Sequence, residues 1–339
     1  MNTAEQKVTV AAFTGRIDDP SSHFRLRQYF QPLTEKGFKF HDFSHPCNAG
    51  CWHLGFFKLV PYLQAIPESR KYDITWLSRT LVRGGQTIEW MLKRPCVLDV
   101  DDAIWLHNSF CSATIANLAR HVDVVVVGNT FLADWFGRHN KNIKIVPTAI
   151  DTERYVVRSE KRNTEHFVIG WTGTSSNFRY LDGIEKPLAN FLTDHRDVML
   201  KIVADRPWQS SMIPPERIIF TQWSRDIEVE SLHEMTVGIM PLEDSDWSRG
   251  KCSFKMLQYM AVGLPVIVSP VGMNRDILQM GNIGFAAETD NQWREALYEL
   301  YKQRSNLYNL GLTGRKKVEA SFATNIIGDK LLEIFKSMV

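Results

Sequence analysis

The chain has 339 residues, of which 44% are hydrophobic and 23% charged, proportions typical of a soluble globular protein long enough for two domains. Its formal charge of +2 excludes a nucleic-acid binder that depends on a strong basic field. The sequence has no apolar run near the ~20 residues of a membrane span, no signal-peptide pattern and five scattered cysteines, which together predict a cytoplasmic protein.

Short apolar segments alternate with helix-like segments along the first half of the chain. A helix is predicted to start near Ser22 and to end at Gly37. The predicted strands cover residues 8–13, 38–43, 73–77, 96–100, 122–127 and 143–146. Strands that alternate with helices over this distance indicate a doubly wound, mostly parallel sheet.

Histidines and cysteines gather at and after the second predicted strand. The residues of these two types are His41, His45, Cys47, Cys51 and His53. They are zinc-binding types, but no second pair follows at a finger-like distance, so ordinary loop residues are favoured over a structural zinc site. The adjoining segment 52–63 would place apolar side chains on one helical face, which favours core packing over contact with a lipid interface.

Three carboxylates accompany the end of the predicted strand 96–100, namely Asp99, Asp101 and Asp102. In open α/β sheets, ligands bind at the carboxyl ends of the strands. These side chains are predicted to hold a hydroxyl-rich substrate, to bind a divalent cation or to cap the next helix. Capping alone does not account for all three.

The charged segment 157–165 is the predicted linker, because the strand pattern begins again after it. The loop that follows the next strand reads Gly-Trp-Thr-Gly and lacks the G-x-G-x-x-G fingerprint of a nicotinamide site. Helices are predicted from near Phe178, over 291–322 and over 325–338. The predicted strands of this half cover residues 166–171, 198–204, 217–220, 237–241, 266–269 and 283–287.

The segment 248–274 carries the strongest local signal. It predicts a loop, a helix with Ser253 as its N-cap, a stop at Gly263 and a short buried strand.

Three cations, Arg249, Lys251 and Lys255, crowd the start of that helix. Free backbone N–H groups and the helix dipole favour anions there, so a phosphate site is predicted, with a solvated basic loop as the alternative. Arg179, at the start of another predicted helix, is either a further anion contact or a surface arginine.

The sequence from 241 to 278, PLEDSDWSRGKCSFKMLQYMAVGLPVIVSPVGMNRDIL, resembles the retaining glycosyltransferases of family 4, which share the GT-B fold. VIGWTGT at 168–174, LDVDDAIW at 98–105 and VPTAIDT at 146–152 support the resemblance. It implies an α/β protein of GT-B architecture, with two Rossmann-like doubly wound domains facing an interdomain cleft. Residues 1–160 would form the acceptor-side domain, 161–322 the donor domain, and 323–339 a helix that packs back on the first.

The resemblance further implies an enzyme that moves a sugar from a nucleotide-diphosphate sugar to a glycan, lipid-linked or other hydroxyl acceptor, with retention at the anomeric carbon. A UDP- or GDP-sugar is the expected donor, and no cofactor, metal or nucleic acid is required. Peripheral contact with the cytoplasmic membrane face and the oligomeric state are left open. The alternatives are a catalytically inactive nucleotide-sugar-binding protein of the same fold and a nucleotide-sugar epimerase or phosphorylase.

The two glutamates of the family's E-x7-E pattern are absent, because their positions are Gly250 and Gln258. Gln258 is expected to hold the ribose hydroxyls, since an amide both accepts and donates. Gly250 cannot replace the first acid, and the upstream candidates to replace it are Glu243, Asp244 and Asp246.

The family's two cations after the first strand of this half fall near Thr174 and Arg179. Arg179 and Lys251, with Lys255, are expected to stabilise the leaving diphosphate. Asp102 is the expected catalytic residue on the acceptor side, by its position rather than by a family role. The expected donor-binding residues are Gly15, Gly173, Thr174, Arg249, Gly250, Lys255, Gln258, Gly272 and Met273, and the expected acceptor-side residues are Arg25 and Asp101.

Overall fold

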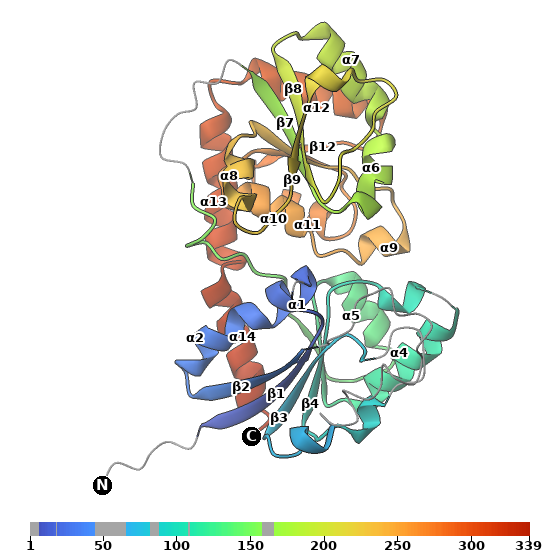
Figure 1. Ribbon diagram of the computed structural model, residues 1–339, viewed down its shortest axis with the longest axis vertical. Helices are drawn as coiled ribbons and strands as arrows, with labels where there is room; N and C mark the ends of the chain where they lie inside the picture. Colours follow the sequence, from blue (N-terminus) through green and yellow to red (C-terminus); the bar gives the residue numbers. More distant parts are fainter. Residues whose placement is uncertain (1–6, 18, 45–65, 82–87, 108, 158–165) are drawn as a thin grey trace. The chain divides into compact units, whose positions relative to one another are not determined.

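The computed structural model describes residues 7–17, 19–44, 66–81, 88–107, 109–157 and 166–339. The chain divides into two compact units (Figure 1). Unit 1 comprises residues 1–149, 250–252 and 324–339, and unit 2 comprises 150–249 and 253–323. Each unit is built on a six-stranded parallel sheet, which confirms the two predicted doubly wound sheets.

The sheet of unit 1 has the strand order β2-β1-β3-β4-β5-β6. Its strands are β1 (Val8–Thr14), β2 (Phe38–Ser44), β3 (Ile74–Ser78), β4 (Cys96–Val100), β5 (Val124–Val127) and β6 (Ile143–Ile145). Every residue of β4 and β5 is buried, as expected for strands covered on both faces. The chain leaves β1 in one direction to form β2 and returns to its other side as β3, so the strand order reverses between β1 and β3.

One face of this sheet is covered by α1 (Pro20–Arg25), η1 (Arg27–Tyr29), α2 (Phe30–Thr34) and the C-terminal α14 (Thr324–Lys336) (Figure 1). Phe335 of α14 packs against Phe38 and Trp76, with ring centroids 5.8 and 5.0 Å away. The remaining elements of the unit are η2 (Glu89–Met91), η3 (Ile104–Leu106), α4 (Ser109–His121) and α5 (Thr130–Phe136).

The single helix predicted from Ser22 to Gly37 is wrong in detail. Its backbone leaves the helical region at Leu26, with φ −121° and ψ −64°, which splits the segment into α1, η1 and α2. Gly37 follows the last turn with φ +95°, a conformation that glycine adopts without a steric penalty.

The sheet of unit 2 has the order β12-β11-β10-β7-β8-β9 and reverses between β7 and β10. Its strands are β7 (Phe167–Thr172), β8 (Val198–Ala204), β9 (Ile218–Gln222), β10 (Val237–Met240), β11 (Val266–Val268) and β12 (Gly284–Ala286). Its helices are α6 (Phe178–Asp182), α7 (Glu185–Asp194), α8 (Glu228–His233), α9 (Asp246–Arg249), α10 (Phe254–Ala261), α11 (Met273–Leu278), α12 (Asp290–Lys302) and α13 (Leu307–Ser321), with η4 (Ser175–Asn177) and η5 (Pro215–Arg217).

Helices α7 and α12 share the main hydrophobic cluster of unit 2 with the sheet, and Trp293 of α12 is fully buried in it. Tyr259 of α10 packs against Gly238 of β10, where a Cβ atom would lie 2.2 Å from the tyrosine ring. Glycine in this strand therefore allows α10 to approach the sheet closely. The helical region predicted over 291–322 is interrupted between α12 and α13, because residues 303–306 form turns.

Several predictions fall outside the described residues: four members of the histidine and cysteine cluster (His45, Cys47, Cys51 and His53), the segment 52–63 and most of the predicted linker. His41 lies on β2. Within the described ranges, no three His, Cys, Asp or Glu side chains are grouped so that they could hold a metal ion. In the same part of the chain, no helix is both long and apolar enough to cross a membrane.

Candidate functional site

Charged side chains meet at the carboxyl edge of the sheet in unit 1, next to the point where its strand order reverses. Arg79 directly follows β3, and Asp101 and Asp102 directly follow β4. The Nη2 atom of Arg79 lies 2.7 Å from Asp101 Oδ1 and 2.9 Å from Asp102 Oδ2. Ligands of doubly wound sheets bind at such reversals, so this is the candidate site of unit 1.

Sequence reasoning missed Arg79, although a cation two residues after the predicted strand 73–77 was a usable signal. Its backbone has φ +58°, which is uncommon for any residue other than glycine. Strained conformations of this kind persist where the surroundings enforce them and are concentrated at functional sites. Here the Arg79 N–H donates to the carbonyl of Asp99 at 2.9 Å, which fixes the strand end.

The two carboxylates beside Arg79 differ in their affinity for protons. Burial, together with the neighbouring Asp101 carboxylate, raises the pKa of Asp102 to about 6. Burial acts in the same direction on Asp101, but Arg79, Arg25 and a 2.5 Å hydrogen bond from Ser21 Oγ outweigh it and lower the pKa of Asp101. Asp101 is thus an ionised anchor, while Asp102 exchanges its proton near neutral pH.

Arg25, predicted on the acceptor side, lies in the interior of unit 1. Only 3% of its side chain is exposed, and its Nε donates to Asp99 Oδ1 at 2.7 Å. Its Nη1 donates to the carbonyl of Val146 at 2.8 Å, which ties α1 to the loop after β6. Arg25 therefore supports the loop that carries Asp101 and Asp102, and its direct contact with an acceptor stays a prediction.

Gly15 closes the loop after β1 onto the start of α1. Its N–H donates to Ser22 Oγ at 2.7 Å, and a Cβ atom at this position would lie 2.8 Å from the same oxygen. A larger residue here would therefore require the Ser22 and Asp19 side chains to shift.

Gly250 and Lys251 belong to unit 1. Asn129 Nδ2 donates to the carbonyl oxygens of both, at 3.2 and 3.0 Å. A Cβ atom on Gly250 would lie 2.8 Å from the Cβ of Ala103 and 2.9 Å from its nitrogen. The space a glutamate side chain would need is therefore occupied. Lys251 partly offsets the rise in the pKa of Asp102, which brings two of the predicted catalytic residues together.

In unit 2, two predicted donor residues meet at the carboxyl end of β7. Lys255, on the first turn of α10, places its Nζ 4.8 Å from the centre of the Trp171 ring. A Cβ atom on Gly173 would lie 2.8 Å from that Nζ. An ammonium group over bare backbone beside a helix start is suited to binding an anion.

The predicted N-cap of α10, Ser253, occupies the N-cap position, but its side chain makes no capping hydrogen bond. Its φ of +53° turns the chain sharply into the helix.

The other predicted cations of unit 2 are paired with the acids proposed to replace the missing glutamate. Arg179 Nη2 lies 3.3 Å from Glu243 Oε1. Arg249 Nε lies 2.7 Å from Asp244 Oδ1, and its Nη1 lies 3.3 Å from Asp246. All five side chains are about half exposed, so these pairs are weak and a charged ligand can displace them.

Thr174 is exposed, and its hydroxyl is bonded to Ser176 and Asn177 within the loop after β7. The same loop is held by Asp205, which follows β8 and accepts from the Ser175 N–H at 2.6 Å.

Gly272 precedes α11 with φ +54°, and a Cβ atom there would lie 2.7 Å from the carbonyl oxygen of Arg249. Its neighbour Met273 is buried.

Gln258 is 3% exposed and lies in a buried network that sequence reasoning did not foresee. Its Nε2 donates to Tyr155 Oη at 3.0 Å and to Glu228 Oε1 at 2.9 Å. The Tyr155 hydroxyl donates to Glu228 Oε2, and Trp223 Nε1 donates to Glu228 Oε1 at 2.9 Å. No local pattern links these residues, since Glu228 is 30 positions from Gln258 and 73 from Tyr155.

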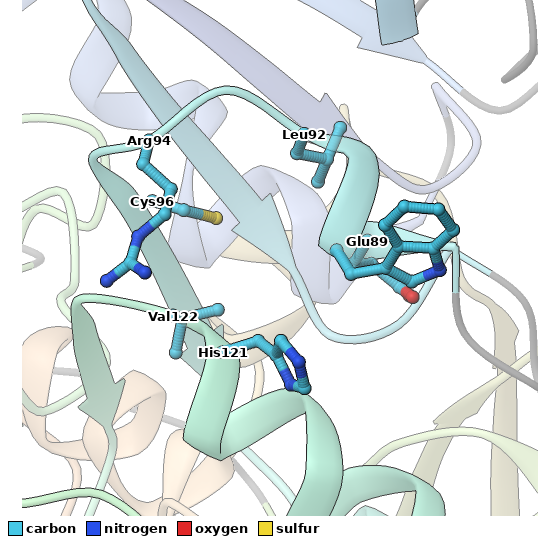
Figure 2. A pocket seen from close by; sticks show the side chains of 7 residues that line it. Glu89, Leu92, Arg94, Cys96, His121 and Val122 are labelled. Carbon is cyan, nitrogen blue, oxygen red and sulfur yellow. The ribbon is translucent and has the colours of Figure 1, made fainter.

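A small cavity of about 120 Å³ lies at the amino edge of the sheet in unit 1, away from the sites above. Figure 2 shows Cys96 at the start of β4 and His121 at the end of α4 beside it, with Leu92 and Arg94. Pockets for drug-sized ligands measure about 300–1,000 Å³, so this one is too small for a nucleotide sugar.

Comparison with known proteins bears on the fold and on the class of protein. Residues 166–303 match the model of the family described as Glycosyl transferases group 1. The chain is 21% identical over 303 residues to the capsular polysaccharide biosynthesis glycosyltransferase CapM of Staphylococcus aureus, a match that covers 86% of this chain and 76% of CapM.

Two solved structures show the same fold over nearly the whole chain. Sucrose-phosphate synthase from Thermosynechococcus elongatus matches with a TM-score of 0.75 at 14% identity, covering 98% of this chain and 99% of that one. HepE of Anabaena, in complex with UDP and glucose, matches with a TM-score of 0.71 at 12% identity, covering 97% and 100%. The chain thus has the GT-B fold, and its matches support a glycosyltransferase of group 1.

Proposed function

We propose that this chain transfers a sugar from a nucleotide-diphosphate sugar, such as a UDP- or GDP-sugar, to a glycan or lipid-linked hydroxyl. In this proposal transfer proceeds with retention at the anomeric carbon and without an obligatory metal. The observation that carries the proposal is the ammonium of Lys255 beside Gly173 at the carboxyl end of β7, in the segment that matches the family model. The HepE structure with UDP and glucose supports the choice of donor class.

On the donor side, negative charge grows on the diphosphate as the sugar leaves. Lys255, Lys251 and the backbone N–H groups at the start of α10 stabilise that charge. Arg179 and Arg249 contribute once a ligand replaces their carboxylate partners. This is electrostatic catalysis by groups already in place, and it is worth several kcal/mol in related cases, about 2.7–4 for a single donor. Gln258 accepts hydrogen bonds from the ribose, and the backbone at Gly272 and Met273 lines the donor site, together with Gly15, Thr174 and Gly250.

On the acceptor side, Asp101 and Asp102 bind the incoming hydroxyl group. Arg79 holds both carboxylates in place, and Arg25 supports them through Asp99. An ionised Asp102 accepts a hydrogen bond from the hydroxyl and orients its oxygen toward the anomeric carbon. In this proposal residues 1–160 form the acceptor side, 161–322 the donor side, and 323–339 a helix belonging to the acceptor side.

The crowded position of Gly250 favours one alternative, a nucleotide-sugar-binding protein that has lost transfer. A glutamate at this position is incompatible with the contact to Ala103. The two functions differ in outcome, because a binding protein retains the intact donor while a transferase releases the nucleoside diphosphate.

The test is a thermal-shift screen with UDP, GDP and ADP, followed by assay of diphosphate release from the corresponding sugar donors with and without EDTA. We expect one nucleotide to raise Tm and its sugar donor to be hydrolysed slowly in the presence of EDTA. NMR of the product reports the anomeric configuration. If none of the three nucleotides raises Tm, the proposed function is wrong.

Lys255→Met is the matched test of the site. We expect it to weaken nucleotide binding about tenfold, since a charge-assisted contact contributes roughly 1.5–3 kcal/mol. Lys302→Met is the control, because Lys302 also lies over an aromatic ring, that of Tyr298 at 4.6 Å, but on α12. Equal effects of the two changes would remove Lys255 from the site.

A further inference from the structure

Gln258 stands where related enzymes carry an acid, and its surroundings decide which of its two polar atoms a ligand meets. Both of its hydrogen bonds are made by Nε2, one to Glu228 Oε1 at 2.9 Å and one to Tyr155 Oη at 3.0 Å. Glu228 is 4% exposed, so its carboxylate is as deeply buried as the amide. The network lies entirely within unit 2.

The orientation of the amide follows from the chemistry of its partners. An ionised carboxylate only accepts hydrogen bonds, so the atom of Gln258 that faces Glu228 has to be the NH2 group. The Tyr155 hydroxyl donates to Glu228 Oε2 and is therefore left with its lone pairs to accept from the same NH2 group. A flipped amide would bring its oxygen against the Glu228 carboxylate.

The orientation is supported from the far side of Glu228. Trp223 Nε1 donates to Glu228 Oε1 at 2.9 Å, and Arg154 Nη2 lies 3.5 Å from Oε2. Arg315 in turn donates to the carbonyl of Tyr155. Glu228 is thus a carboxylate whose charge is compensated by four donors, and Gln258 is one of them.

The other polar atom of the Gln258 amide is Oε1, which takes no part in this network. Oε1 makes no hydrogen bond to any residue that the structure describes. In that part of the chain, the polar atoms that lack a partner and are also fully buried do not include Oε1. It therefore keeps access to solvent. It is also an acceptor with no donor next to it, so it suits a ligand hydroxyl and not a ligand carbonyl.

We propose that Glu228 and Tyr155 are positioning residues that lock the Gln258 amide with Oε1 turned to the donor, so that it accepts hydrogen bonds from the ribose hydroxyls. This proposal rests on the proposed function. The negative charge that related enzymes place at position 258 is held by Glu228 in this chain. The preference for ribose over a dideoxyribose then depends on Glu228 and Tyr155, since only a correctly oriented amide presents an acceptor to the ribose hydroxyls.

Restoring the family acid provides the test. Gln258→Glu places a second carboxyl group 2.9 Å from Glu228 Oε1, where two carboxylates cannot both ionise easily and one proton is shared. While that proton is present, the introduced carboxyl group donates to Glu228 and presents its other oxygen to the ribose, as the amide does. When the proton is lost, the two carboxylates repel each other, and the introduced side chain no longer holds its oxygen toward the ribose. Nearby Arg154 and the Tyr155 hydroxyl limit the repulsion but do not remove it.

The measurement is UDP affinity by calorimetry between about pH 5.5 and pH 8.5, with GDP or ADP in its place if one of these raises the Tm of the wild type more. The terminal phosphate of a nucleoside diphosphate itself loses a proton near about pH 6, so each affinity is compared with that of the wild type at the same pH. We expect the affinity of Gln258→Glu relative to the wild type to fall at least about tenfold as pH rises. Gln279→Glu, an exposed change on the same unit, is the control and should follow the wild type. A ratio of Gln258→Glu to wild-type affinity that is independent of pH overturns the proposal.

Tyr155→Phe is the second variant, in case Gln258→Glu does not fold at high pH. It removes one hydroxyl, and the affinity ratio between UDP and 2′,3′-dideoxy-UDP reports on the presented acceptor. We expect the ratio to fall about threefold, as for the loss of a hydrogen bond of ordinary strength. A lower Tm with an unchanged ratio shows a purely structural role and overturns the proposal. If the wild type binds none of the nucleotides, the proposed function has failed instead.

Discussion

The ammonium group of Lys255 lies where a side chain on Gly173 would begin. A Cβ atom at Gly173 would be 2.6 Å from Lys255 Cε and 2.8 Å from its Nζ. The glycine therefore leaves the space in which the ammonium lies, and the Trp171 ring, 4.8 Å from Nζ, forms the other side of that space. This relationship links the end of β7 to the start of α10 at the candidate donor site.

Gly173→Ala should displace the Lys255 ammonium and weaken UDP binding about tenfold, because a charge-assisted contact to the diphosphate is lost. Calorimetric titration with UDP measures the effect. Gly183→Ala serves as the control, since a Cβ there meets its nearest atom at an ordinary 3.5 Å. Unchanged affinity in Gly173→Ala would show that Lys255 does not contact the nucleotide.

The rate of sugar transfer should depend on the protonation of Asp102. Burial and the Asp101 carboxylate raise the pKa of Asp102 to about 6, so the ionised form, which we propose binds the acceptor hydroxyl, is lost as pH falls through this value. We expect the rate to fall about tenfold per pH unit well below that pKa and to level off above it.

Asp102→Asn should lower the rate and abolish this acidic limb, whereas the exposed Asp134→Asn should keep it. The profile of kcat against pH makes the comparison. An acidic limb that survives in Asp102→Asn would assign the titration to another group.

Gly250→Ala should destabilise unit 1, because the added Cβ would lie 2.8 Å from the Cβ of Ala103 and 2.9 Å from its nitrogen. Overpacking of this kind costs about 1–3 kcal/mol in the free energy of unfolding. Gly328→Ala is the control: it lies inside α14, its Cβ would be 3.7 Å from Tyr29, and helix propensity favours alanine. Urea titration should show opposite signs for the two changes, and a Gly250→Ala protein as stable as the wild type would contradict the contact.

Asp99→Asn should lower the free energy of unfolding by about 3–5 kcal/mol, because it removes the carboxylate that is hydrogen-bonded to the buried guanidinium of Arg25. Few other hydrogen bonds compensate for the burial of this pair, since Arg25 Nη2 and Asp99 Oδ2 have no hydrogen-bond partner among the described residues. Glu68→Gln, which breaks an exposed pair with Lys71, should change stability by less than about 1 kcal/mol. A small effect of Asp99→Asn would show that solvent reaches Arg25.

The elements that the sequence predicted well are those whose signal is local. Strand β4 (Cys96–Val100) and strand β8 (Val198–Ala204) have their predicted bounds, because each is a short apolar run interrupted by one charged residue, a pattern typical of strands covered on both faces of a parallel sheet. The helix after Ser22 was predicted poorly, because Pro32 has no N–H with which to continue a single helix and is tolerated only in the first turn of a new one, α2.

The candidate site also contains residues with a local sequence signal and residues without one. The cations at the start of α10 could be identified from residue order alone, because helix ends carry a fixed electrostatic asymmetry. The pairing of Arg79 with Asp102 and the hydrogen bond between Gln258 and Glu228 could not be assigned from residue order, because the partners are 23 and 30 positions apart. Tertiary packing alone determines such distances.

The sequence by itself determined the two parallel sheets and the gathering of cations around the start of α10, since apolar periodicity and helix-end charges are properties of neighbouring residues. Tertiary structure decided which charges stay available to a ligand. It buried Arg25 against Asp99, placed Lys255 beside Gly173, filled the space beside Gly250 with Ala103 and bonded the Gln258 amide to Glu228. These outcomes depend on desolvation and close packing between distant segments, which a linear pattern does not encode.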